Sequence, residues 1–474
     1  MKKYIVTFFS LLLLISCSDD KYEKMNVDPK NPSSVPAEYL FTSASKELMD
    51  QVTNLNVNTN IFRFVSQYLT ATTYTQEPNY NLTDRNIPES HFLLLYRNVL
   101  IDLKDAEEFT RANNQLLEES EVNARLAQIQ VLQVYTWQYL VDTFGNVPYS
   151  EALSTSNTTP MYDDAQIIYE DLINRLIENN NNFGGQGFTS GEDLIFNGEM
   201  SKWQKFSNSL LLRLGMRLTE SNPELANTAV QAAVSNGVME SNEDNALFQY
   251  LSSPPNTNPL WVDLVQSGRN DYVVANTLVD DLNELEDPRR TVYFDDNLAS
   301  GYEGGIYGAS NSYANFTHIG SEFTDPTHPG ILMDYAEVEF LLTEAAARGV
   351  AGVSNAETHY ENAVTASLEY WLGSDADATS YLAQPNVAYS ANNWEEVVAQ
   401  QFWIAMFDNA FQGWYVWRKF DAPEFNLPEV SGNPVPLRFT YPIREQNLNG
   451  ESYSEAASAI GGDTQQTALF WDVE

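Results

Sequence analysis

Cysteine is almost absent from this chain, because Cys17 is the only one among 474 residues. A disulfide within the chain is therefore excluded, and stability has to come from packing. Histidine is rare as well, and His91, His318, His328 and His359 are scattered without the spacing of a zinc site. Zinc chemistry is not predicted.

Positive charge is scarce: 25 Lys and Arg stand against 65 Asp and Glu, which gives a formal net charge of -40. Because phosphate binding needs clustered cations, nucleic acid is not an expected partner. The acids are spread along the chain rather than gathered in one tail, which is typical of a solvated surface that keeps an exported protein soluble. The 43% hydrophobic content is enough for a sizeable core.

The motifs of several enzyme classes are missing. The chain has no GxSxG elbow, Walker loop or dinucleotide glycine fingerprint. Ser43-Ala-Ser-Lys46 fits an SxxK pattern, but no KTG follows, and chance explains it better. A carboxylate pair for glycoside hydrolysis is recognised only by its separation in space. We therefore expect no catalytic residues and keep an exported glycoside hydrolase or peptidase as the alternative.

Metal ligands are equally sparse, and we expect neither a metal site nor a cofactor. Asp295-Asp296-Asn297 and Asp375-Ala-Asp377 offer oxygen ligands for a structural calcium ion. Neither segment has the glycine and terminal Glu of an EF-hand loop. Structural calcium is the alternative here.

A single apolar run, Tyr4 to Ile15, opens the chain behind Lys2 and Lys3. It is shorter than the roughly 20 residues that cross a bilayer, and it predicts a signal peptide over residues 1–16. Leu14-Ile15-Ser16-Cys17 is similar to the lipobox of bacterial lipoproteins, which makes Cys17 the predicted site of lipid attachment. Several acyl chains on one residue hold a protein firmly at a membrane. A plain secreted protein is the alternative.

After the cysteine, residues 17–36 read as an acylated N-terminus and tether, because Asp28-Pro29 and Asn31-Pro32 form turns. Residues 37–474 are predicted to form a single, mainly α body, since apolar residues recur in them every three or four positions. Helices are predicted over residues 38–52, 61–72, 91–110, 122–144, 163–178, 201–219, 224–235, 273–285, 333–348, 355–371 and 394–411.

Alternating hairpins of two helices are typical of tetratricopeptide-like repeats. Ala356, Tyr360 and Ala363 match the second half of that repeat, whereas the first half matches loosely. Long irregular segments interrupt the helices at residues 183–191, 251–271, 294–331 and 423–474. Such loops are usually functional or disordered, and their aromatic content argues against disorder.

Three aromatic clusters, two in or beside these loops and one in a further loop at residues 73–89, are candidate ligand sites. Flat rings offer contact area at little entropic cost, while hydroxyl and short polar groups supply hydrogen bonds, so an oligosaccharide or a peptide fits them. The alternative is that the rings pin the loops onto the body. The candidates are Tyr302, Tyr307, Tyr313 and Phe316 in the first cluster; Trp261, Arg269, Asn270, Asp271 and Tyr272 in the second; and Tyr74 with Tyr80 in the third.

Several short motifs, each weak alone, follow one another in a specific order. In that order the chain resembles the SusD/RagB-like nutrient-binding outer-membrane lipoproteins of Gram-negative bacteria, in a diverged SusD-like branch. The motifs are Asn26-Val-Asp-Pro-Lys-Asn-Pro32, Phe144-Gly-Asn-Val-Pro-Tyr-Ser-Glu-Ala152, Pro160-Met-Tyr-Asp-Asp164, Lys202-Trp-Gln-Lys-Phe-Ser-Asn208 with Arg213 and Arg217, residues 337–349, and Arg438-Phe-Thr-Tyr-Pro442 with Glu445 and Asn449.

The resemblance covers nearly the whole mature chain and carries several expectations. It implies tetratricopeptide-like helical hairpins with a loop-rich ligand-binding portion, to which it assigns all three aromatic clusters. It also implies a non-catalytic lipoprotein on the outer face of the outer membrane. Such a protein binds a nutrient, here an oligosaccharide or else a peptide, and passes it to a TonB-dependent transporter, a SusC-like barrel. A scaffold without a small ligand is a further alternative.

Replacing the predicted lipid attachment residue tests the membrane anchor. Cys17→Ala is expected to abolish membrane retention and leave ligand affinity unchanged, because the chains on this residue are the only anchor predicted. Fractionation of cells and the mass of the intact mature protein measure the first effect, and a binding titration measures the second. Ser18→Ala is the matched control. Unmodified Cys17 in the mature wild-type protein would contradict the prediction.

Overall fold

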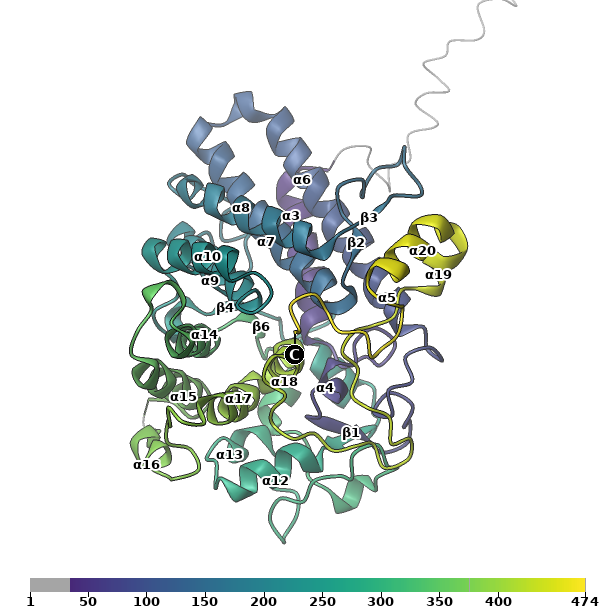
Figure 1. Ribbon diagram of the computed structural model, residues 1–474, viewed down its shortest axis with the longest axis vertical. Helices are drawn as coiled ribbons and strands as arrows, with labels where there is room; N and C mark the ends of the chain where they lie inside the picture. The colour runs from purple at the N-terminus through teal and green to yellow at the C-terminus, as the bar shows by residue number, and fades with distance from the viewer. Residues whose placement is uncertain (1–34, 375, 474) are drawn as a thin grey trace, which may run out of the picture.

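Helical hairpins packed side by side form most of the molecule (Figure 1). The computed structural model describes residues 35–374 and 376–473, so the predicted signal peptide, Cys17 and most of the predicted tether lie outside the described residues. The long helices of the first half are α3 (Ala37–Thr53), α6 (Ile101–Ala112), α7 (Glu119–Phe144), α8 (Ala165–Asn179), α9 (Met200–Arg217) and α10 (Pro223–Asn236).

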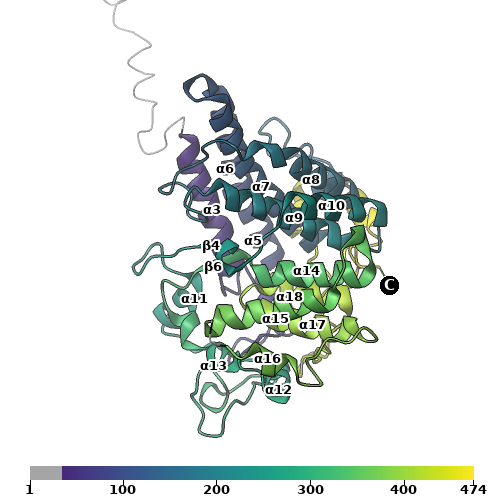
Figure 2. The ribbon, with the colours of Figure 1, turned by 90° about the vertical axis from the view of Figure 1, so that its left-hand side faces the viewer.

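The second half continues the stack, which runs in Figure 2 from α6 and α7 through α9 and α10 to α14, α15 and α17. The mainly α fold of helical hairpins is thereby confirmed. The remaining α-helices are α14 (Tyr335–Arg348), α15 (Ala356–Leu372), α17 (Trp394–Ala405), α18 (Ala410–Phe420), and the short α4 (Phe62–Val65), α5 (Ile87–Leu94), α11 (Pro259–Trp261), α12 (Asn276–Glu284), α13 (Arg290–Tyr293), α16 (Ala378–Leu382), α19 (Ile443–Leu448) and α20 (Gly450–Ala459).

Helix ends coincide with capping residues in the sequence. Asp164 caps α8 by accepting hydrogen bonds from the backbone N–H groups of Gln166 and Ile167. Asp334 caps α14 in the same way, and Gly349 ends that helix in a left-handed conformation that glycine adopts without steric cost. These local signals explain why the predicted boundaries of these helices lie close to the observed ones.

Three short antiparallel strand pairs in the described residues were not predicted: one strand replaces the end of a predicted helix, and two others move the start of a predicted helix by two or three residues. The chain turns at Gln67, whose φ is +56°, and then enters a strand, so the helix predicted over 61–72 is only α4. The helices predicted over 273–285 and 333–348 likewise begin after strands. Every residue of β1 is buried, so no alternation marks it in the sequence. The pairs are β1 (Leu69–Ala71) with β5 (Tyr272–Val274), β2 (Val147–Pro148) with β3 (Tyr162–Asp163), and β4 (Ala246–Phe248) with β6 (Gly330–Met333).

The helix predicted over 394–411 is two helices, because a 3₁₀ turn at Met406–Asp408 separates α17 from α18. Asp408 in this turn is buried and binds Arg63 of α4 at 2.9 Å and His328 at 3.0 Å. Burial lowers the pKa of His328, but the Asp408 and Glu322 carboxylates outweigh it and raise that pKa to about 9. The 3₁₀ turn between α17 and α18 is therefore joined by ion pairs to α4 and to the segment that contains His328.

A single hydrophobic core cluster extends from Ala37 to Trp471. Trp403 and Trp414 are fully buried in it, whereas Trp417 is half-buried. Among residues 35–374 and 376–473, no helix combines the length and apolar content that crossing a membrane requires.

Buried ion pairs join the helices inside this core. Arg213 of α9 binds Glu337 of α14 through two contacts of 2.6 and 2.7 Å, which gives Arg213 a structural role. Asp142 of α7 accepts from Arg217 of α9 at 3.2 Å, from the Tyr169 hydroxyl at 2.5 Å and from the Trp471 indole at 3.0 Å. One carboxylate thus connects two neighbouring helices and the C-terminal segment.

Removing the charge of this carboxylate tests how much the core depends on it. Asp142→Asn keeps the shape of the side chain but leaves the buried Arg217 guanidinium without its counter-ion, so we expect stability to fall by about 3 kcal/mol. Urea unfolding measures the change. Glu108→Gln removes the exposed Lys104–Glu108 pair and should cost less than about 0.5 kcal/mol. Equal losses for the two variants would show that the buried pair contributes no more than the surface pair.

Candidate functional site

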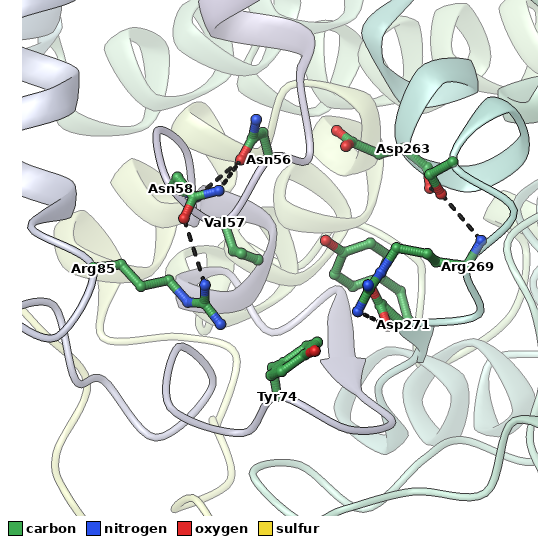
Figure 3. A pocket seen from close by; sticks show the side chains of 10 residues that line it. Asn56, Val57, Asn58, Tyr74, Arg85, Asp263, Arg269 and Asp271 are labelled. Carbon is green, nitrogen blue, oxygen red and sulfur yellow. Dashed lines mark hydrogen bonds and ion pairs between the residues drawn. The ribbon is translucent and has the colours of Figure 1, made fainter.

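A pocket of about 360 Å³ lies where three loops meet on the loop-rich side of the molecule (Figure 3). The loops follow α3, follow β1, and precede β5. We call this cavity the Tyr74 pocket. Its lining residues are Asn56, Val57, Asn58, Tyr74, Arg85, Asp263, Ser267, Arg269, Asp271 and Tyr272.

The β1–β5 ladder brings two of these loops together. Ala71 pairs with Tyr272 at the end of the ladder. Beyond it, the Thr72 backbone N–H donates to the Asp271 carbonyl at 2.9 Å, and the Thr72 hydroxyl donates to the Asn270 carbonyl at 2.6 Å. Tyr74 and Tyr272 therefore line one cavity although about 200 residues separate them.

The loop after α3 closes the pocket on another side. The Asn56 side-chain oxygen accepts from the Asn58 backbone N–H at 3.0 Å and from its amide group at 2.8 Å, which is the local turn typical of asparagine. The Tyr272 hydroxyl donates to the Leu55 carbonyl at 3.2 Å and ties this loop to β5. The three segments are thus linked by hydrogen bonds of their own.

Two guanidinium groups approach the ring of Tyr74, which is 41% exposed. The Arg85 and Arg269 carbons lie 5.3 and 5.2 Å from the ring centroid, within the range of cation–π attraction. Each is held from behind by a carboxylate: Arg85 by the fully buried Glu77, and Arg269 by Asp271 at 2.5 and 3.1 Å. The hydrogen bond with Asp271 raises the pKa of Arg269. Both groups are therefore fixed cations.

Asp263 is the second carboxylate in the lining, and no cation of the described residues pairs with it. It lies in a π-helical turn at Val262–Gln266, a deviation that is frequent at functional sites. Partial burial raises the pKa of Asp263 to about 6; the Leu55 backbone N–H lowers it, and the Asp271 charge raises it. Figure 3 shows its carboxylate directed across the cavity toward Asn56. The group is still mostly ionised at neutral pH.

The pocket unites two of the predicted clusters, because Tyr74 meets Arg269, Asp271 and Tyr272 in it. The exposed Asn270 adjoins it and contributes its carbonyl to the loop bond with Thr72. Trp261 is half-buried in α11 and does not line the cavity.

Burial corrects the predictions for Tyr80 and Tyr307. Their exposed fractions are only 2% and 1%, so neither ring has a face for a ligand. The Tyr80 hydroxyl accepts from Gln67 at 3.0 Å, and the Tyr307 hydroxyl donates to the Phe64 carbonyl at 2.6 Å. These two rings pin their loops onto the body, which is the alternative that the sequence left open.

The other rings of residues 300–316 lie outside the Tyr74 pocket and are half-buried. Tyr302 packs edge-on against Phe294, with centroids 5.3 Å apart. Tyr313 stacks on His318 with centroids 3.7 Å apart. The Phe316 carbonyl accepts from Asn297 within the same loop. The structure does not gather these three rings with the residues of the Tyr74 pocket, so their predicted ligand role remains a prediction.

Sequence reasoning missed six lining residues. The asparagine-rich run at 56–60 is a turn signal that was available. No local pattern marks an arginine or an aspartate as facing a cavity, because that depends on which distant loops meet. The missed residues are Asn56, Val57, Asn58, Arg85, Asp263 and Ser267.

In the described part of the chain, no group of three or more His, Cys, Asp or Glu is arranged to hold a metal ion. Asn297 of the first calcium candidate serves the loop, since its side-chain oxygen accepts from the His318 backbone N–H at 3.0 Å. In the second, Asp375 lies outside the described residues, and Asp377 caps α16. A structural calcium ion remains an untested alternative.

The family model SusD-like, described as starch-binding and associating with the outer membrane, matches residues 29–442. Comparison with curated proteins gives no match. Among solved structures, a chitin-binding protein is 26% identical with a TM-score of 0.78, covering 92% of this chain and 100% of its own. A SusD-like protein from Bacteroides thetaiotaomicron is 25% identical with a TM-score of 0.77, covering 92% and 98%. A chitin-binding SusD homologue from Flavobacterium johnsoniae, 24% identical with a TM-score of 0.77 over 93% and 98%, shares the fold.

The raised pKa of Asp263 predicts a pH-dependent stability effect. The folded-state pKa of about 6 exceeds the usual 3.8, so ionisation opposes folding, and this penalty grows as the pH rises from 3.8 to 6. Asp263→Asn removes the penalty and should stabilise the protein by about 1 kcal/mol at neutral pH, after allowance for solvent screening. It should change nothing below the usual pKa. Urea midpoints across this range measure the effect, and a gain that is equal at every pH would contradict it.

Proposed function

The chain belongs to the SusD-like family of starch-binding proteins that associate with the outer membrane, and from that premise we propose that it captures an oligosaccharide at the cell surface. The ligand binds in the Tyr74 pocket without being cleaved. The observation that carries this proposal is the convergence of one accessible aromatic ring with charged and amide groups from three loops.

The chemistry of the lining suits a sugar. An exposed ring offers an apolar surface to the apolar face of a pyranose, while fixed polar groups around it hydrogen-bond to hydroxyls. Arg85, Arg269 and Asn58 provide donors, and Asp263 and the amide oxygens provide acceptors. The guanidinium groups are held by carboxylates before a ligand arrives, which lowers the entropy lost on binding. Chitin-type saccharides deserve testing first, because two structural relatives are described as chitin-binding.

Delivery to a transporter completes the proposal. A lipid on Cys17 would hold the protein at the membrane, and the segment up to residue 36 would act as its leash. From there the bound sugar passes to a TonB-dependent transporter, a SusC-like barrel. Family membership supports this route, and co-purification from membranes tests it, with one large barrel expected as the main partner. Several unrelated partners would favour a scaffold instead.

The hydrolase alternative has a weak basis in this pocket. Asp263 and Asp271 are its two lining carboxylates, and a glycosidase needs a pair with one acid and one free base or nucleophile. Both oxygens of Asp271 are bonded to Arg269, which leaves it poorly placed for either role. Incubating the purified protein with polysaccharide and casein tests the alternative. Release of product, abolished by one acid substitution, would favour an enzyme.

Truncating the exposed ring tests the location of the site. Tyr74→Ala should weaken oligosaccharide binding by about tenfold or more, equivalent to ~1.4 kcal/mol, because a central aromatic contact is lost. Calorimetric titration with starch, chitin and xylan oligosaccharides and a peptide mixture measures the effect and identifies the ligand class.

Two matched variants control for loss of a tyrosine. Tyr39→Ala removes a ring that is 67% exposed at the start of α3 and should bind normally. Tyr313→Ala tests whether the ligand binds at the aromatic loop of residues 300–316 instead of at the Tyr74 pocket. If Tyr313→Ala loses binding while Tyr74→Ala retains it, the site lies in that loop. Tight binding of a peptide without any glycan would overturn the proposed ligand class.

A further inference from the structure

The charges lining the Tyr74 pocket do not cancel. Arg269 is neutralised by Asp271, and Arg85 by Glu77 directly behind the lining. Asp263 then remains, and among the described residues it has no cation within ion-pair distance. When Asp263 is ionised, the immediate surroundings carry one uncompensated negative charge. A partly buried carboxylate has lost part of its hydration. It therefore interacts more strongly with a bound cation than an exposed carboxylate would.

We propose that the Tyr74 pocket prefers an oligosaccharide bearing a free protonated amine, and that Asp263 is the residue that selects it. The inference rests on the proposed capture of an oligosaccharide at this pocket and adds the chemical class of the sugar. The amine would bind the Asp263 carboxylate, while the sugar ring would lie toward Tyr74. An acetylated or neutral sugar would offer only uncharged groups to the same carboxylate.

The arrangement of charge within the pocket supports one orientation. In Figure 3 Asp263 and Tyr74 lie at opposite ends of the cavity. The two guanidinium groups lie within 5.3 Å of the Tyr74 ring centroid and thus belong to the Tyr74 end. Sugar hydroxyl oxygens accept hydrogen bonds from these cations, and an amine is repelled from them toward Asp263. The field of a chain with a net charge of -40 also favours a cationic ligand over an acidic one.

The groups around Asp263 determine how its charge responds to pH. Asp271 raises its pKa and the Leu55 backbone N–H lowers it. The other charged or titratable side chains in the lining are Tyr74, Arg85, Arg269 and Tyr272. With a pKa of about 6, Asp263 loses its charge in mildly acidic solution. Amine binding should therefore weaken as the pH falls below that value, while binding of a neutral sugar should change much less.

Three trisaccharides with the same β-1,4-linked backbone test the effect of the C2 substituent alone. They differ only at C2, which carries an amine in the glucosamine trimer, an acetamide in chitotriose and a hydroxyl in cellotriose. Calorimetric titration of the mature chain near neutral pH should give the tightest binding for the glucosamine trimer, by about tenfold, as expected for a charge-assisted hydrogen bond. A trigalacturonate, which bears carboxylates, should bind most weakly.

Two variants separate the local contact from the field of the whole protein. Asp263→Asn should remove the preference for the amine and the loss of affinity below pH 6, so that this variant binds the glucosamine trimer no more tightly than it binds chitotriose. Asp105→Asn changes net charge equally at an exposed position of α6 and should leave the preference intact. Unfolding midpoints establish that both variants are folded.

The outcomes distinguish this inference from the function on which it rests. If chitotriose or cellotriose binds as tightly as the glucosamine trimer, the inference is wrong and oligosaccharide capture stands. If the preference survives in Asp263→Asn, another group selects the amine and the assignment of Asp263 is wrong. If a lysine-containing peptide binds and no trisaccharide does, both the inference and the proposed sugar ligand fail.

Discussion

The Asp142 carboxylate, buried where α7, α8, α9 and the C-terminal segment meet, is the contact on which the helical body most depends. It accepts from Arg217, Tyr169 and Trp471, and the Asp142 carbonyl accepts from Arg418. An isolated charge in this position would be expelled by its desolvation cost, so the helices pack only in the arrangement that supplies these donors.

The use of cations inside the core also explains the excess of carboxylates at the surface. A chain with 25 Lys and Arg against 65 Asp and Glu that buries several of its cations has few left to pair with the carboxylates at its surface. The buried cations are Arg63, Arg213, Arg217, Arg289, Arg418, Lys419 and Arg438.

The site depends on this body through a short chain of contacts. Arg63 of α4 is held by Asp408 between α17 and α18, which places the chain that enters β1. The pairing of β1 with β5 then places the loop that holds Tyr74 beside Tyr272. Because the three loops of the Tyr74 pocket are attached to separate parts of the body, their side chains can differ without disturbing the helix packing. Ligand chemistry and fold stability are therefore largely separable in this architecture.

The sequence predicted most of the helical hairpins because their helices bury an apolar stripe of helical period, as α8 does, and some of them, including α8 and α14, begin at a side-chain cap. It failed at β1, β5 and β6, since a strand of three or four mostly buried residues is too short to show a period and exists only through a distant partner. The site followed the same division. Tyr74 and Tyr272 were recognisable by type, whereas Tyr80 and Tyr307 have the same type and are buried. No sequence pattern could mark Asp263 as a lining residue, because only the position of three distant loops in the fold distinguishes it from the other acids.

Asp263 also shows that the proposed binding site is held at some expense to stability. A core that satisfied every charge would place a cation beside this carboxylate, as it does for Asp142 and Asp408. The chain instead leaves Asp263 facing a cavity, in a π-helical turn, with its pKa raised by partial burial. Unpaired groups and irregular helices of this kind persist where a ligand completes them. The contrast between the paired Asp142 carboxylate of the core and the Asp263 carboxylate of the pocket, which has no cation partner among the described residues, therefore supports the proposal that the pocket binds a ligand.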